Sequence, residues 1–71
     1  MTESMVGYEI SVGGHMGATI RSAFPDLQTR VRGHHTVLSG VFADQAALYG
    51  ALAQVEALGL ELIEVRRLPR P

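Results

Sequence analysis

The sequence predicts an α+β fold in which two helices pack on one face of a four-stranded antiparallel sheet. Residues 43–59 have the period of an amphipathic helix. Residues 8–12 and 35–42 have the composition and alternation of strands. The chain has 71 residues and no cysteine, so a small single domain must be stabilised by packed secondary structure.

The amino-terminal third predicts a strand followed by a short helix. Residues 8–12 alternate between apolar and polar side chains, as in a half-buried strand. A helix is expected over residues 15–24, ending before Pro25, because the residue that precedes a proline is disfavoured in the helical region. The glycine-rich stretch 13–17 connects the two elements.

The middle of the chain predicts a β-hairpin. A short strand over residues 28–32 is followed by the pair Gly33-His34, in which glycine supplies the positive φ of a hairpin turn. Residues 35–42, with the sequence HTVLSGVF, form the most strand-like run of the chain.

The main helix and a last strand complete the chain. Asp44 stands where an N-cap is expected, and Gly59 stands just past the carboxyl end of the helix. Residues 60–68 form a strand that alternates imperfectly, and the prolines that follow bar its continuation. Residues 1–71 are one domain, with residues 1–6 and 69–71 expected to be frayed tails.

The order strand, helix, strand, strand, helix, strand is the ferredoxin-like βαββαβ arrangement, with two right-handed βαβ units. It predicts the strand order 4-1-3-2 and both helices on one face. The alternative is a three-stranded sheet in which residues 28–32 do not pair.

The second face of the sheet predicts self-association. In residues 35–42, Val37 and Val41 point one way while Leu38 and Phe42 point the other, so both faces carry apolar side chains. Two helices cover only one face, and a second copy of the chain is the simplest cover for the other. The sequence therefore predicts a homodimer that forms through the sheet or its edges. A monomer with a few exposed apolar residues is the alternative.

Four residues are the candidate interface residues on this argument. Tyr49 joins them because it borders the apolar stripe of the main helix, next to Gly50, which is unusual inside a helix and suggests a close approach. The four candidates are Val37, Val41, Tyr49 and Ile63.

The turn after the first strand is a candidate ligand site. Gly13, Gly14, His15 and Gly17 lie where backbone amides and a helix amino end can hold a small anion. The spacing matches neither a dinucleotide fingerprint nor a P-loop. A tight turn that needs glycine only for its backbone conformation is the alternative.

Histidines and serines do not form a catalytic or metal-binding set in the sequence. His34 and His35 are adjacent in a strand, so their side chains point to opposite faces and do not share one metal ion within a chain. The first and third strands are expected to run parallel, which places His15 at the other end of the sheet. We expect no metal, no cofactor and no enzyme activity, with a site between two chains as the open alternative for the histidine pair.

Charge and hydropathy indicate the class of protein. A net charge of −1 argues against a nucleic-acid partner. The sequence contains no apolar run of about 18 residues, so no membrane span is expected. The amino terminus MTESMVGYEI contains no basic residue, unlike a signal peptide. A cytoplasmic location is the expectation.

Three motifs resemble a group of very small actinobacterial proteins. They are TVLSG at residues 36–40, DQAALYG at residues 44–50 and LGLELIEVRR at residues 58–67. This resemblance carries no catalytic residue over to the chain. At the level of the fold, the chain is also similar to ACT-type domains and dimeric α+β-barrel proteins, which assemble through their sheets and bind small molecules at interfaces.

Three functions follow as hypotheses. The first is a non-catalytic homo-oligomeric protein-interaction module, which can also dock on another protein. The second is an ACT-like domain that binds or senses a small metabolite at residues 13–17 or at the dimer interface. The third is a small dimeric-barrel enzyme with a histidine as general base. The lack of convergent titratable groups favours the first.

Overall fold

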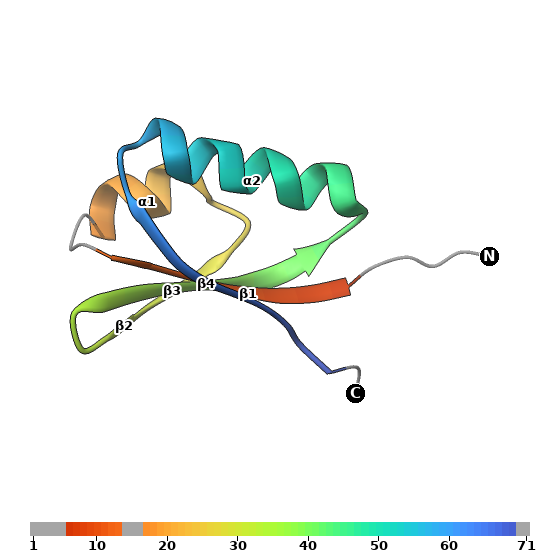
Figure 1. The fold of residues 1–71 in the computed structure, drawn as a ribbon, viewed down its shortest axis with the longest axis horizontal. Coiled ribbons are helices and arrows are strands. Elements are labelled where there is room, and N and C mark those ends of the chain that lie inside the picture. Colours follow the sequence, from red (N-terminus) through yellow and green to blue (C-terminus); the bar gives the residue numbers. More distant parts are fainter. Residues whose placement is uncertain (1–5, 14–16, 70–71) are drawn as a thin grey trace.

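The computed structural model describes residues 6–13 and 17–69. Its elements follow the predicted order of strand, helix, strand, strand, helix, strand (Figure 1). They are β1 (Val6–Gly13), α1 (Gly17–Ala23), β2 (Gln28–Arg32), β3 (His35–Phe42), α2 (Gln45–Ala57) and β4 (Glu61–Arg67). The predicted ferredoxin-like α+β fold is confirmed.

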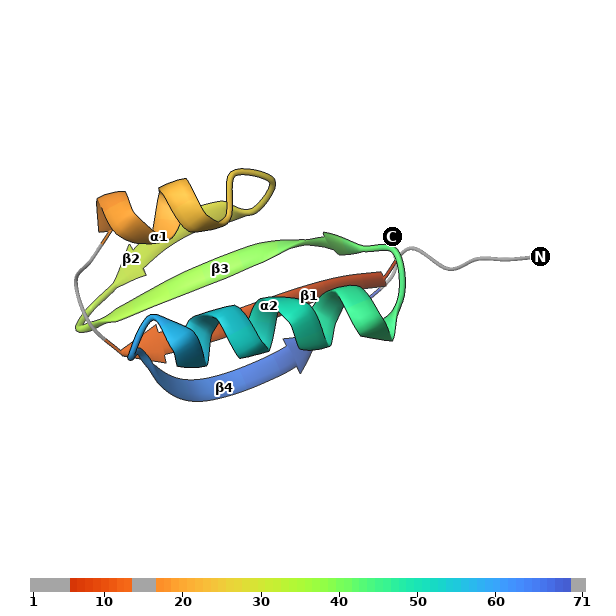
Figure 2. The same ribbon diagram turned by 90° about the horizontal axis from the view of Figure 1, so that it is seen from above.

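The four strands form one antiparallel sheet in the order β2-β3-β1-β4. Both helices lie on the same side of it, α1 towards β2 and α2 towards β4 (Figures 1 and 2). The alternative of a three-stranded sheet is wrong, because β2 pairs with β3 along its whole length, from Gln28 opposite Ser39 to Arg32 opposite His35.

The structure corrects the expected direction of two strands. β1 and β3 are neighbours and run antiparallel, with Gly13 opposite His35. They had to be antiparallel because an antiparallel sheet reverses direction at every step, and β3 lies directly beside β1. The hairpin with His34 and the end of β1 therefore lie at the same end of the sheet. Val6, expected in a frayed tail, is the first residue of β1.

Helix α2 begins and ends where the sequence predicts. The backbone N–H of Ala47 donates a 2.8 Å hydrogen bond to Asp44 Oδ1, so Asp44 is the N-cap. Gly59 has a φ of 76° just past the helix end, and Gly33 has a φ of 62° in the hairpin turn. Both values lie in the left-handed region that favours glycine.

The core lies between the helices and the sheet, and we call the sheet surface that lines it the helix face. Ile10 and Val12 of β1 and Leu38 and Phe42 of β3 belong to this core. The helices contribute Ile20, Leu48, Ala51 and Val55, and Phe24, which follows α1, joins them. The opposite surface of the sheet, which the helices do not cover, is the open face. Val37 and Val41 are on the open face, because they pair with Ser11 and Gly7, whose positions alternate with the core residues of β1.

Candidate functional site

The predicted ligand turn is only partly within the described residues. Gly13 is the last residue of β1 and Gly17 is the first residue of α1. Gly14 and His15 lie outside the described residues. The helix that follows this turn has seven residues. The described part of the turn therefore adds no side chain to a ligand site.

The histidine pair lies at the turn of the β2–β3 hairpin. His34 follows Gly33 in this turn, and His35 begins β3 opposite Gly13 and Arg32. Both histidine side chains are exposed. Within residues 6–13 and 17–69, no three histidine, aspartate or glutamate side chains are grouped so that they could hold a metal ion.

The four predicted interface residues do not share one surface. Val37, Val41 and Ile63 lie on the open face, whereas Tyr49 lies on α2 in the helix layer. Val37 is only 1% exposed, although no helix covers it, while Val41 is 57% exposed. A residue that is already buried within its own chain adds little to an interface. Val41, Tyr49 and Ile63 remain available for contact.

The open face is mainly polar, and Val37 lies beside an arginine on it. Arg30 of β2 lies beside Val37, and its guanidinium Nη2 lies 3.3 Å from Glu9 Oε2 of β1. Because β3 lies between these two strands, the Arg30 side chain crosses β3 on the open face. The long apolar stem of an arginine can shield a neighbouring valine in this way.

Three of the six large apolar residues that are exposed in the described part of the chain belong to strand β4. This strand is at the end of the sheet, and every one of its seven residues is exposed. Leu62 is 47% exposed and Val65 is 37% exposed, although both pair with core residues of β1. Figure 2 shows α2 above β1, with β4 alongside it at the edge of the sheet.

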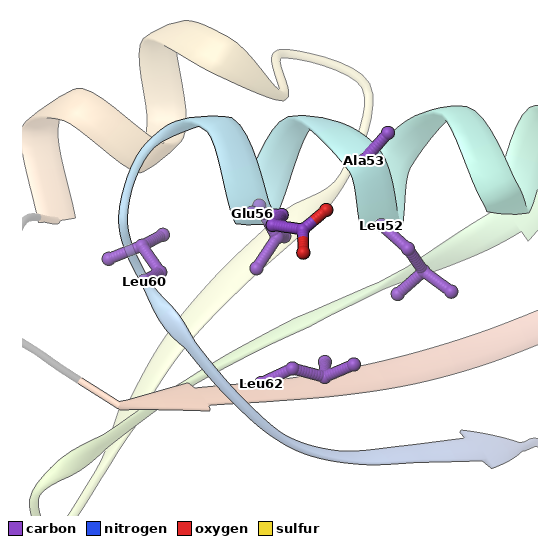
Figure 3. A pocket seen from close by; sticks show the side chains of 6 residues that line it. Leu52, Ala53, Glu56, Leu60 and Leu62 are labelled. Carbon is purple, nitrogen blue, oxygen red and sulfur yellow. The ribbon is translucent and has the colours of Figure 1, made fainter.

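A groove runs between α2 and β4. Its volume is about 420 Å³, and its lining is mainly apolar. Leu52 extends into the groove from α2, and Leu60 and Leu62 extend into it from the segment that follows the helix (Figure 3). The Glu56 carboxylate lies at the mouth of the groove. Ala53 and Val55 complete the lining. We call this groove together with β4 the β4 edge surface.

Charges of both signs border the β4 edge surface. Glu61 and Glu64 belong to the first part of β4, and Arg66 and Arg67 belong to its end. Arg66 is paired with Glu9 of β1, so it lies on the open face beside the Glu9–Arg30 ion pair. The surface can therefore offer an apolar groove, an unpaired strand edge and complementary charges to one partner.

The break in alternation within residues 60–68 indicates an irregular strand at this surface. The alternation of residues 60–68 fails at Leu62-Ile63, and the structure has an irregularity in the β1–β4 pairing at that point. Ser11 pairs with Glu64 and Val12 pairs with Leu62, so Ile63 is an extra residue, as in a β-bulge. The break in alternation therefore indicates a bulge rather than a strand that is covered on both faces.

The described residues contain no helix that is both long and apolar enough to cross a membrane. No curated protein and no solved structure matches the chain. Residues 7–66, from β1 almost to the end of β4, match the family model described as "Domain of unknown function (DUF8691)", and the chain therefore belongs to this family.

Proposed function

We propose that the protein is a non-catalytic, homo-oligomeric protein-interaction module, and that a second copy of the chain docks on the β4 edge surface. The observation that carries this proposal is the exposure of β4 along its whole length beside an apolar groove. An edge strand offers unpaired backbone donors and acceptors, which another strand can satisfy.

The β4 edge surface suits this role better than the open face does. On the open face, Val37 is already buried within its own chain, and Arg30 and Glu9 keep the surface charged. On the β4 edge surface, Leu62 and Val65 are exposed next to the partly buried Leu52 and Leu60. Contiguous apolar side chains of this kind mark interaction sites more often than isolated ones do.

The expected affinity is modest. Complete burial of a valine or leucine side chain stabilises by about 1.5–3 kcal/mol, and the apolar residues of β4 are roughly half exposed beforehand. Association costs at least about 4 kcal/mol in lost translational and rotational freedom. Burial of these side chains alone therefore gives only a small favourable free energy of association. Backbone pairing between the two edge strands must add to it. We expect a dissociation constant in the micromolar range.

The experiment is a measurement of molar mass by light scattering over a concentration series. The wild-type chain should approach twice the 7.6 kDa of one copy as its concentration rises above micromolar. Leu62→Asp should stay at the mass of one copy, because it places a carboxylate in the buried part of the interface.

Val31→Asp is the matched control for this experiment. Val31 is 62% exposed on β2, at the opposite edge of the same sheet. This variant should dimerise like the wild type. A wild-type chain that stays at 7.6 kDa at all concentrations contradicts the proposal, and the charges and bulge of β4 would then serve to keep the edge unpaired.

A further inference from the structure

We infer that the two copies pair β4 with β4 in an antiparallel manner, about a two-fold axis that passes between Ile63 and Glu64. Leu62 then lies opposite Val65 of the second copy, and Glu61 lies opposite Arg66 of the second copy. This inference rests on the proposed function, since it specifies how the β4 edge surface is occupied. It follows from the face on which each side chain of β4 lies.

Four residues of this segment lie on the helix face. Leu62 pairs with Val12 and Val65 pairs with Ile10, and both partners belong to the core. Leu60, which precedes the strand, lines the groove beneath α2. Arg67 pairs with Tyr8, which packs against the same core, so Arg67 is on this face as well.

The remaining residues lie on the open face. Glu64 pairs with Ser11 and Arg66 pairs with Glu9, both of which alternate with the core residues of β1. At the next open-face position of β1, a Cβ on Gly13 would lie 3.6 Å from both Ile63 Cδ1 and Glu61 Cβ. Ile63 and Glu61 therefore point to the open face too.

The bulge makes the order of faces symmetric. From residue 60 to residue 67 the faces read helix, open, helix, open, open, helix, open, helix. This order is the same in both directions about the midpoint between Ile63 and Glu64. Residues that lie opposite each other in an antiparallel pair must share a face. A strand with strict alternation could not satisfy this condition with an axis between two residues.

The registers with axes close to this midpoint fail the same condition. An axis through Ile63 places Leu62 of the helix face opposite Glu64 of the open face. An axis through Glu64 places Ile63 of the open face opposite Val65 of the helix face. Moving the axis one whole residue from the midpoint creates similar mismatches beside the bulge. Only the axis between Ile63 and Glu64 matches every pair over residues 60–67.

The same register brings opposite charges together. Glu61 faces Arg66 of the second copy on the open face, and the symmetry forms this pair twice. On the helix face, Arg67 of the second copy lies opposite Leu60, at the groove whose mouth carries the Glu56 carboxylate. Complementary charges of this kind set register and orientation more than affinity.

Disulfide crosslinking tests the register directly, because the chain has no cysteine of its own. Leu62→Cys and Val65→Cys chains are mixed and oxidised. The two-fold axis places position 62 of one copy opposite position 65 of the other, within the Cα separation of about 7 Å that a disulfide tolerates. Identical positions are three residues apart along the strands, or about 10 Å, so neither variant should crosslink with itself.

Charge reversal provides a second, independent readout. Glu61→Arg chains have two arginines at positions 61 and 66, and Arg66→Glu chains have two glutamates there. Each variant should have a dissociation constant at least about tenfold higher than the wild type, because both pairs become repulsive. A mixture of the two variants should restore dimers, since every pair in the mixed dimer is again of opposite charge.

The outcomes separate this inference from the proposed function. If the wild type is a dimer by light scattering, two results overturn the register. One is crosslinking within either cysteine variant alone. The other is a mixture of the charge-reversed variants that dimerises no more tightly than each variant does by itself. A monomeric wild type instead overturns the proposed function and the register together. Crosslinking in the mixture only, with restored dimers after charge reversal, supports the register.

Discussion

The guanidinium of Arg30 on β2 lies 3.3 Å from the carboxylate of Glu9 on β1, with strand β3 between them. This contact spans the open face at the position of Val37, which is 1% exposed without help from either helix. The stem of Arg30 therefore lies beside a valine that no helix covers. This arrangement also explains why the open face is not the strongest candidate for docking.

Arg30→Ala should lower the free energy of unfolding by about 1 kcal/mol or less, because the Arg30 side chain is largely solvent-exposed and such ion pairs are weak. Arg30→Met should cost less than Arg30→Ala, since methionine retains an apolar stem over Val37. Urea denaturation measures the free energy of unfolding of both variants. The matched control is the same pair of substitutions at Arg32, which lies opposite His35. If the alanine and methionine variants differ in stability by the same amount at position 32 as at position 30, the result contradicts the shielding of Val37 by Arg30.

Glu64→Gln should strengthen the dimer. In the inferred register, the two Glu64 carboxylates lie on either side of the two-fold axis, each opposite Ile63 of the other copy. Removal of this charge relieves repulsion and lowers the cost of desolvation, so the dissociation constant should fall several-fold. Sedimentation equilibrium measures the change, with Glu56→Gln as a comparison that should not strengthen the dimer. A weaker dimer with Glu64→Gln would argue against the position of the axis.

Gly50→Ala should stabilise the chain by about 1 kcal/mol, because glycine is a poor helix former and α2 is helical at this position. Among the described residues, nothing lies within 4 Å of a Cβ built on Gly50. No close approach by another described residue therefore accounts for this glycine. Thermal unfolding measures the gain. A loss of stability at low concentration would mean that the backbone at Gly50 requires glycine.

Asp44→Ala should destabilise the chain by about 1 kcal/mol, because it removes the acceptor for the Ala47 N–H at the start of α2. Asp44→Asn is the control, since it retains the side-chain oxygen and removes the charge. Chemical denaturation of both variants should show asparagine close to the wild type and alanine well below it. An asparagine variant as unstable as alanine would show that the charge, rather than the cap hydrogen bond, is responsible.

The fold could be predicted from the sequence because its signals are local. The period of α2, the cap at Asp44 and the turn at Gly33 each depend on a few neighbouring residues. The order of the six elements then leaves few topologies. The direction of β1 relative to β3 was predicted wrongly, although it follows from the antiparallel sheet.

The candidate surface could not be predicted to the same degree, because exposure depends on how far α2 reaches across the sheet. Leu62 and Val65 have the pattern of core residues, and they are exposed on the strand at the edge of the sheet. Val37 has the pattern of an uncovered residue, and it is buried beside Arg30, whose side chain reaches across β3 to Glu9. Both outcomes depend on contacts between segments that are distant in the sequence.

Amide hydrogen exchange, measured residue by residue by NMR at low and high protein concentration, tests the central claim most directly. If a second copy pairs with β4, the outward-facing amides of residues 61–67 should exchange more slowly as concentration rises. The amides of β2, at the other edge of the sheet, should not change. Exchange in β4 that is independent of concentration, or protection that develops in β2 or around Val41 instead, would contradict docking at the β4 edge surface.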